Sequence, residues 1–262
     1  MHGLMQDYPL TVQHILWRVE RLFGKKEVVT VREQGYHRYT YAEFAKRTHQ
    51  LAHALANLGV QPGDRVATLA WNNYRHLEAY YAIPCMGAVL HTLNLRLFPE
   101  QLAFVINDAD DKVIVVDKTL IPILNRVAGK IPGVAKIIVL NDGGPLPPHD
   151  LGELIDYEEL IGGESSAYPW PALDERSAAA MCYTSGTTGN PKGAVYSHRS
   201  QFLHTMGALQ KGSLNLGEAD AILPVVPMFH ANSWGIPYAA GMAEPPQTTV
   251  WTLGSRSPVC SR

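Results

Sequence analysis

The sequence predicts an α/β fold in which mostly parallel strands form layered sheets with helices on their faces. Three observations support this class. Helix-like and strand-like segments alternate along the first 140 residues. Residues 113–116 and 137–140 are short apolar runs without polar alternation, as in strands that a parallel sheet buries on both faces. A helical segment near residues 120–128 lies between them and completes a β-α-β unit.

The first two helices are predicted from spacing and from capping residues. Residues 12–22 carry apolar side chains at helical spacing after Thr11, a residue type that often begins a helix. Thr40 is followed three residues later by Glu43, which is the pattern of a capping box. A second helix should therefore begin at this point, and Gly59 should end it.

The middle of the chain continues the alternation. Residues 62–64, Pro-Gly-Asp, predict a turn that leads into a strand over residues 65–71. A helix over about 74–86 and a strand around 88–93 should follow. Pro99 occupies the first turn of the next predicted helix, where a missing N–H costs nothing, and this helix should run to about Asn107.

The pattern weakens after residue 141 and resumes near residue 178. Residues 178–182 and 193–196 are predicted to be strands on either side of a loop. Ser197 should cap a helix that ends near residue 211, and residues 220–226 should form the next buried strand. Residues 237–243 have the composition of an ordinary packed helix.

These elements divide into two subdomains and a tail. We predict a first α/β subdomain over residues 1–175 and the start of a second over 176–243. The last nineteen residues, 244–262, contain nine Pro, Ser or Thr residues and no usable periodicity. We predict that this tail is disordered and that the reading frame was disrupted, or the chain cut, near Ala243. A genuine short C-terminal tail is the alternative.

Composition excludes several classes of protein. Apolar residues make up 46% and charged residues 18% of the 262 positions, as in soluble globular proteins. A net charge of −2 gives no basic surface for nucleic acid. The N-terminus lacks a signal-peptide pattern, and no apolar run approaches the roughly 20 residues of a membrane span. The three cysteines have no metal-ligand spacing, so we expect a cytoplasmic protein with buried thiols at Cys85 and Cys182.

The run from Tyr183 to Gly193 is the strongest chemical signal. It holds four Ser or Thr hydroxyls, three glycines and one lysine within eleven residues. Glycine lets backbone N–H groups approach a ligand closely. The hydroxyls add hydrogen-bond donors and Lys192 adds a point charge. Such a loop is suited to wrapping a polyphosphate, although a solvated surface turn has a similar composition.

Two common phosphate loops do not fit this run. A Walker A loop has Gly-Lys followed by Ser or Thr, whereas Lys192 lies between Pro191 and Gly193. A dinucleotide fingerprint requires G-x-G-x-x-G at the start of a helix, and that string is absent from the run.

The eleven-residue string resembles the signature of the adenylate-forming enzymes, which include acyl-CoA synthetases, luciferases and peptide-synthetase adenylation domains. Residues from about 11 to 243 look like the N-terminal half of a medium- or long-chain fatty acyl-CoA synthetase. Weaker supporting strings lie at residues 39–43, 63–67, 76–80, 86–92 and 226–230.

The resemblance implies roles for individual residues. The loop would grip the β- and γ-phosphates of ATP, and Thr184 would also be a ligand of Mg²⁺. His230 would line the site near the reacting carboxylate and α-phosphate, as a catalytic and substrate-binding residue. Trp234 would share a helical face with His230 and gate the acyl chain's tunnel, if the segment is helical. Ordinary structural roles are the alternative for both residues. The implied loop residues are Thr184, Ser185, Gly186, Thr187, Thr188, Gly189 and Lys192.

The resemblance also implies a two-step ligase reaction. A fatty acid attacks ATP to give an acyl-adenylate and pyrophosphate, and the thiol of CoA then displaces AMP. Mg²⁺ is expected because hydroxyls and one lysine cannot neutralise a triphosphate. Members of this branch can also form homodimers.

The family's adenine-binding segment, its Tyr-Gly-x-Thr-Glu motif and its C-terminal catalytic lysine have no matching strings in this sequence. We therefore expect an acyl-CoA synthetase by descent that is inactive as a fragment. A non-catalytic nucleotide- or acyl-binding module and one half of a split synthetase are the alternatives.

Overall fold

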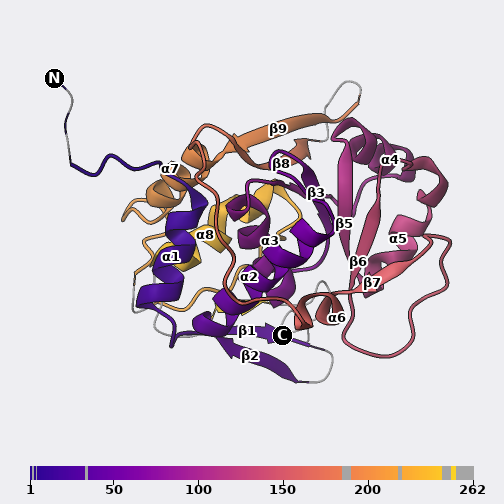
Figure 1. Ribbon diagram of the computed structural model, residues 1–262, viewed down its shortest axis with the longest axis horizontal. Helices are drawn as coiled ribbons and strands as arrows, with labels where there is room; N and C mark the ends of the chain where they lie inside the picture. Colours follow the sequence, from indigo (N-terminus) through magenta and orange to yellow (C-terminus); the bar gives the residue numbers. More distant parts are fainter. Residues whose placement is uncertain are drawn as a thin grey trace.

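The structure is a computed structural model that describes residues 1, 3, 5–32, 35–184, 190–217, 220–243 and 249–251. A seven-stranded sheet in the order β7-β6-β5-β3-β4-β8-β9 forms its centre (Figure 1). Neighbouring strands pair in parallel except β8 and β9, which are antiparallel. The strands of this sheet are β3 Arg65–Leu69, β4 Val89–Thr92, β5 Asp111–Asp117, β6 Lys136–Leu140, β7 Leu154–Asp156, β8 Ala178–Thr184 and β9 Lys192–Ser197.

Helices cover both faces of this sheet (Figure 1). One face carries α1 Val12–Leu22, α2 Tyr41–Asn57, α3 Tyr74–Cys85, α6 Tyr157–Gly162, α7 His198–Ala208 and α8 Ile236–Ala243. The other face carries α4 Pro99–Asp108, the 3₁₀ turn η1 Lys118–Leu120, α5 Ile121–Asn125 and the 3₁₀ turn η2 Ala128–Lys130. The predicted α/β class with a mostly parallel sheet is therefore confirmed.

The continuous apolar strands fill two separate cores. In β5, Val113 and Val115 pack in the core that contains α1, α2 and α3, whereas Ile114 and Val116 pack in the core that contains α4 and α5. Successive side chains of a strand point to opposite faces, so both faces of β5 need apolar residues. This is why the run lacks the polar alternation of a half-exposed strand.

Most predicted helices and strands are present. The capping box of α2 is formed: Thr40 Oγ1 accepts from the Glu43 amide at 3.2 Å, and Glu43 Oε2 accepts from the Thr40 amide at 2.7 Å. Gly59 follows α2 with φ +91°, a backbone conformation that glycine adopts without steric cost. Cys85 and Cys182 are buried free thiols, as predicted. The helix predicted near 120–128 is instead broken into η1, α5 and η2.

The strand predicted over residues 220–226 is wrong. This segment has no regular secondary structure and pairs with no strand in the described part of the chain. The side chain of Asn72 takes the place of a neighbouring strand: its Nδ2 donates to the carbonyls of Pro224 and Val226, both at 3.1 Å. Its Oδ1 accepts from the Met228 amide at 2.6 Å. One buried amide thus satisfies backbone groups that a sheet would otherwise pair.

A second, three-stranded sheet joins distant parts of the chain. Strands β1 Glu27–Val31 and β2 Tyr36–Thr40 form an antiparallel pair, and β10 Thr249–Trp251 pairs with β1 in parallel. The backbone of residues 249–251 thus differs from the disordered tail predicted for 244–262. The other residues of that tail lie outside the described part.

The predicted boundary at residue 175 does not coincide with an edge of the sheet. Strand β8 lies after it and pairs with β4, which lies before it, so the seven-stranded sheet continues across this position. The division into subdomains 1–175 and 176–243 stays a prediction. No helix in the described ranges is both long and apolar enough to cross a bilayer.

A partly buried ionic network ties α2, α3 and α6 together. Arg47 on α2 lies 2.7 Å from Glu78 on α3 and 2.8 Å from Glu158 on α6. Arg75 lies 2.7 Å from both Glu158 and Asp142. Burial alone would raise the pKa of Glu158, but the hydrogen bonds and charges of the two arginines outweigh it and lower this pKa to about 2.

Glu158→Gln should therefore change the pH dependence of stability. The folded protein lowers the pKa of Glu158 from 4.5 to about 2, so the ion pairs stabilise the fold above about pH 4.5 and are lost as the pH falls toward 2. The difference in unfolding free energy between wild type and variant, measured in urea at several pH values, should narrow over this range.

Glu159→Gln provides the control, because this neighbouring side chain is exposed. If the difference in unfolding free energy between wild type and Glu158→Gln stays constant down to pH 2, the proposed stabilisation by the Glu158 ion pairs is contradicted.

Candidate functional site

The predicted phosphate loop joins the two strands of a hairpin. Thr184 at the end of β8 pairs with Lys192 at the start of β9, and Thr184 Oγ1 lies 3.4 Å from the Lys192 carbonyl, to which it donates. Both residues are exposed. Residues 185–189, which include the predicted Ser185, Gly186, Thr187, Thr188 and Gly189, lie outside the described part. The structure therefore places the two ends of the loop next to each other.

Polar contacts hold the base of this hairpin. The Tyr183 hydroxyl donates to Asp108 at 2.6 Å, and the Tyr183 ring lies against His91 with a centroid distance of 5.2 Å. His91 Nδ1 in turn lies 2.9 Å from the buried carboxylate of Asp111. Burial raises the pKa of Tyr183, and the bond to Asp108 adds to that rise, so the phenol stays protonated as a donor. The end of β8 is thereby fixed against its neighbours.

The second predicted site segment has an unusual backbone. His230 is exposed with φ −114°, and the following 3₁₀ turn η3 Ala231–Gly235 is left-handed. The four residues from Ala231 to Trp234 have φ between 45° and 53°. A left-handed conformation costs roughly 1–2 kcal/mol per residue that carries a Cβ. The predicted common helical face of His230 and Trp234 is wrong, because the turn has the opposite hand.

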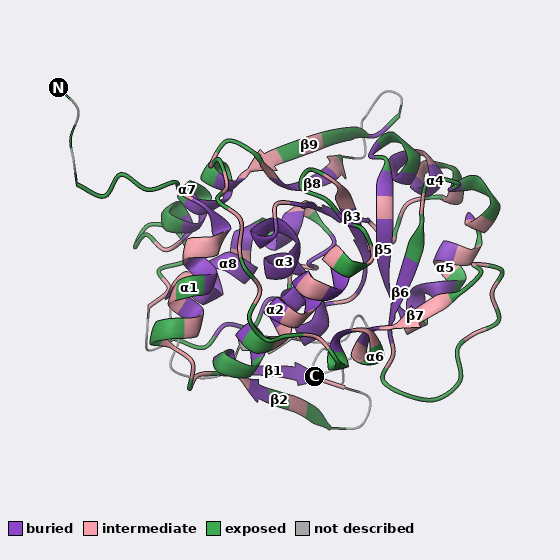
Figure 2. Cartoon of the chain, in the orientation of Figure 1, coloured by how far each residue is buried: buried purple, intermediate pink, exposed green. Residues whose placement is uncertain are grey.

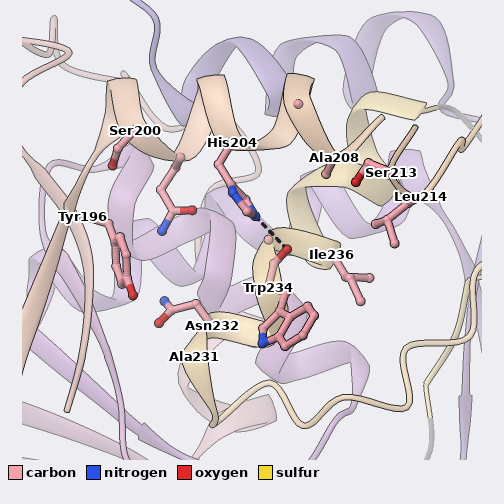
Figure 3. A pocket seen from close by; sticks show the side chains of 13 residues that line it. Tyr196, Ser200, His204, Ala208, Ser213, Leu214, Ala231, Asn232, Trp234 and Ile236 are labelled. Atoms are coloured by element: carbon pink, nitrogen blue, oxygen red, sulfur yellow. Dashed lines mark hydrogen bonds between the residues drawn. The ribbon is translucent and has the colours of Figure 1, made fainter. Parts of the chain in front are cut away.

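Specific hydrogen bonds hold this strained turn. Ser233 Oγ donates to the Val226 carbonyl at 2.9 Å, and the Ser233 amide donates to the His230 carbonyl at 2.9 Å. His204 on α7 lies with Nε2 3.0 Å from the Trp234 carbonyl (Figure 3). A strained backbone persists only where its surroundings determine it in this way, and such segments concentrate at functional sites.

A pocket of about 860 Å³ lies between β9, α7 and η3 (Figure 3). Trp234 lines it with an exposure of 66%, whereas His230 is not among the residues that line it. The described lining consists of Tyr196, Ser200, Gln201, His204, Gly207, Ala208, Ser213, Leu214, Ala231, Asn232, Trp234, Gly235 and Ile236.

Sequence reasoning missed the polar residues of this pocket. Tyr196, Gln201, His204 and Asn232 lie on three separate elements, and no spacing in the sequence indicates that they meet. Asn232 carried a weak signal, because Asn tolerates the left-handed region better than other residues with a Cβ. The described residues contain no group of three or more His, Cys, Asp or Glu side chains able to hold a metal ion, so the predicted Mg²⁺ ligand Thr184 stays a prediction.

Comparison with known proteins identifies the family. The model of the AMP-binding enzyme family matches residues 16–243. The chain belongs to this family. It is 46% identical to a medium-chain-fatty-acid–CoA ligase of Ectopseudomonas oleovorans, over 92% of this chain and 44% of that protein. It is also 46% identical to a long-chain-fatty-acid–CoA ligase of Thermus thermophilus, over 90% of this chain and 42% of that protein.

The names of more distant relatives refer to other acids. A 4-hydroxybutyrate–CoA ligase of Metallosphaera sedula is 35% identical over 88% of this AMP-binding chain and 41% of its own length. Among solved structures, the anthranilate CoA ligase AuaEII in complex with anthranoyl-AMP has a TM-score of 0.82 at 19% identity, over 100% of this chain and 48% of that chain. At this identity the likeness shows the fold alone. The chain spans less than half the length of the curated relatives that it matches.

Gly235→Ala should disrupt the left-handed turn of this AMP-binding chain. Gly235 has φ +71°, and an added Cβ would lie 2.7 Å from His204 Cδ2, the side chain that holds the turn. We expect a loss of about 1–3 kcal/mol in unfolding free energy, measured in urea.

Gly207→Ala is the matched control, because Gly207 lines the same pocket from helix α7 and an added Cβ would meet nothing within 4 Å. This change should leave stability unchanged or raise it by about 0.5–1 kcal/mol. Equal losses in the two variants would refute the role assigned to the Gly235–His204 contact.

Proposed function

We propose that this chain forms the part of a fatty acyl-CoA synthetase that grips the triphosphate of ATP and receives the acid. The carrying observation is that one strand, β9, bears both the lysine of the phosphate loop and a wall of the pocket. Lys192 and Tyr196 are four residues apart and therefore lie on the same face of this strand. At about 3.4 Å per residue they are separated by about 14 Å.

The proposed reaction is the two-step ligation that the resemblance to acyl-CoA synthetases implies, placed on this arrangement. An acid held in the pocket presents its carboxylate toward the hairpin, and a carboxylate oxygen attacks the α-phosphate of ATP. Pyrophosphate leaves toward the loop, whose hydroxyls, N–H groups and Lys192 stabilise its negative charge. Mg²⁺, with Thr184 as a ligand, would neutralise the rest of this charge. The thiol of CoA then displaces AMP to give acyl-CoA. In this proposal His230 acts near the reacting groups and Trp234 gates the acyl pocket.

We further propose that the chain alone does not complete this reaction. Two or three hydrogen bonds to charged phosphate, at roughly 1.5–3 kcal/mol each, give only about millimolar affinity after the costs of binding. Loss of a single preorganised electrostatic group typically lowers a rate by about 10²–10³. The family's lysine, Mg²⁺-binding glutamate and ribose-binding aspartate have no matching motifs in this sequence. Within this proposal the protein is cytoplasmic and forms a homodimer through its N-terminal segments.

Incubation with ATP, Mg²⁺, CoA and octanoate or palmitate should release no AMP above background, measured by chromatography. Calorimetry should nevertheless detect binding of ATP to the chain, with a Kd in the millimolar range. Lys192→Ala should weaken this binding by about tenfold or more, because it removes a charge-assisted bond to phosphate.

Lys211→Ala provides the control, since Lys211 is an exposed lysine beyond the end of α7. Robust turnover would overturn the proposed inactivity, and a chain that gives no heat with ATP would overturn the phosphate-binding role. Micromolar binding of ATP or a fatty acid without turnover would favour a non-catalytic binding module.

A second candidate function, one half of a two-part synthetase, is favoured by the surface of the chain. Strand β9 is largely uncovered (Figure 2), and large apolar side chains are exposed on it and on the segments that follow. Helix α7 buries Phe202 on one side yet exposes Leu203 and Met206 on the other. We define the apolar face as Leu203, Met206, Leu214, Leu223, Val225 and Trp234.

We propose that the remainder of the AMP-binding fold covers the apolar face, on the same polypeptide or on a separate one. This proposal is supported by the chain's coverage of less than half of its curated relatives. A large exposed apolar surface marks an interaction site or an association hazard.

The chain alone should therefore associate in solution. A double substitution, Leu203→Glu with Met206→Glu, should shift sedimentation velocity profiles toward monomer. Phe98→Glu is the control, because Phe98 is also a large exposed apolar residue but lies at the start of α4, away from the apolar face. A wild-type chain that is already monomeric at high concentration would count against the proposal. Addition of a separate polypeptide covering the remaining part of the Thermus ligase should restore AMP release if the two-part hypothesis holds.

A further inference from the structure

The side chain of Asn232 is a buried polar group in the pocket wall. It is only 3% exposed, and neither its Oδ1 nor its Nδ2 has a hydrogen-bond partner in the described part of the chain. In Figure 3 its amide lies between η3 and Tyr196 on β9, and both polar atoms of the amide are buried. Buried amides are almost always paired, and an exception at a pocket wall points to a partner that enters the pocket.

The charges around the pocket restrict what this partner can be. None of the residues found to line it is Asp, Glu, Lys or Arg. His204 is the one imidazole in that lining, and it is engaged by the Trp234 carbonyl. A second carboxylate or an ammonium group on the ligand would lose its hydration here without gaining an opposite charge, which is costly. The partner of Asn232 is therefore neutral.

The chemistry of the amide narrows the choice further. Asn presents an acceptor at Oδ1 and donors at Nδ2, so its complement both donates and accepts. A hydroxyl group meets this requirement, and Ser200, Gln201 and Tyr196 line the same pocket with further donors and acceptors. Leu214 and Ile236 supply apolar wall for methylene groups.

We propose that the pocket selects carboxylic acids that carry a hydroxyl group along the acyl chain, recognised by Asn232. This inference rests on the proposed function, because it assumes that the pocket receives the acid. A backbone explanation competes with it, since Asn232 has φ 49° and Asn is favoured in the left-handed region. Glycine would serve that backbone role equally well but would lack the amide, which allows the two explanations to be separated.

The test measures binding of six-carbon acids to the full chain by calorimetry. Hexanoate is compared with 4-, 5- and 6-hydroxyhexanoate and with adipate. At least one hydroxyhexanoate should bind about tenfold more tightly than hexanoate, because the hydroxyl satisfies a buried donor and acceptor. Adipate should bind no more tightly than hexanoate.

Asn232→Gly should abolish the preference for the hydroxy acid, so that hexanoate and the hydroxyhexanoates bind this variant with equal affinity. Asn215→Gly is the matched control, because Asn215 also has a left-handed backbone, with φ 50°, but is exposed and does not line the pocket. The control should keep the wild-type preference, and thermal unfolding of both variants checks that they fold.

The outcomes separate this inference from the proposed function. Equal affinities of the wild type for hexanoate and every hydroxyhexanoate would overturn the inference and leave the acid-binding role intact. A preference that persists in Asn232→Gly would overturn the assignment to Asn232. If hexanoate and all its derivatives fail to bind, the acid-binding role itself fails, and the inference falls with it.

Discussion

Complete burial of helix α3 is the constraint on which the rest of the structure depends. Every residue from Tyr74 to Cys85 is buried (Figure 2), so each polar group on the helix must find a partner inside the protein. Tyr80 donates its hydroxyl to the Met228 carbonyl, and Tyr81 donates to the Pro237 carbonyl at 2.9 Å. These two acceptors lie on either side of the left-handed turn. The hydrogen bonds that satisfy the tyrosines of this buried helix therefore also fix both ends of the segment that shapes the pocket.

The central sheet provides the second part of this arrangement. Strand β8 pairs with β4 on one side and with β9 on the other, so the hairpin that carries the phosphate loop extends directly from the core. Contacts at Tyr183 fix its position against α4 and β4. The loop ends and the pocket wall are therefore built on a rigid strand pair, and binding elements placed on such scaffolds are held more precisely than elements on free loops.

Local sequence patterns predicted the parts of this fold that depend on local physics. The capping box at Thr40 and the two-sided apolar run of β5 are visible in the sequence, because a cap and a buried strand are each decided within a few residues. We wrongly predicted a strand over residues 220–226, because a run of apolar residues is as compatible with a buried strand as with the unpaired segment that the structure has. Their backbone is instead satisfied by Asn72, about 150 residues earlier, and no local pattern encodes such a contact.

The candidate site also combines features that a local sequence pattern predicts with features that depend on distant contacts. The hydroxyl- and glycine-rich string before Lys192 is a local signal, and it pointed to the AMP-binding family that the comparisons identify. The hand of the turn at Asn232 is not a local signal, because residues with a Cβ adopt it only when several distant groups hold them there. His204 and Val226 supply those contacts. The polar wall of the pocket therefore became visible only in three dimensions.

Strand β9 lies at one end of the sheet order, and this position determines where a further strand can be added to the sheet. Within the described ranges β9 has a neighbouring strand on one side, β8, so the peptide groups along its other side face outward. A strand supplied from elsewhere can hydrogen-bond to this row without any rearrangement of the cores behind it. The sheet thus remains open for extension at the strand that carries both the lysine and the pocket tyrosine, so an added strand would lie beside the proposed chemistry.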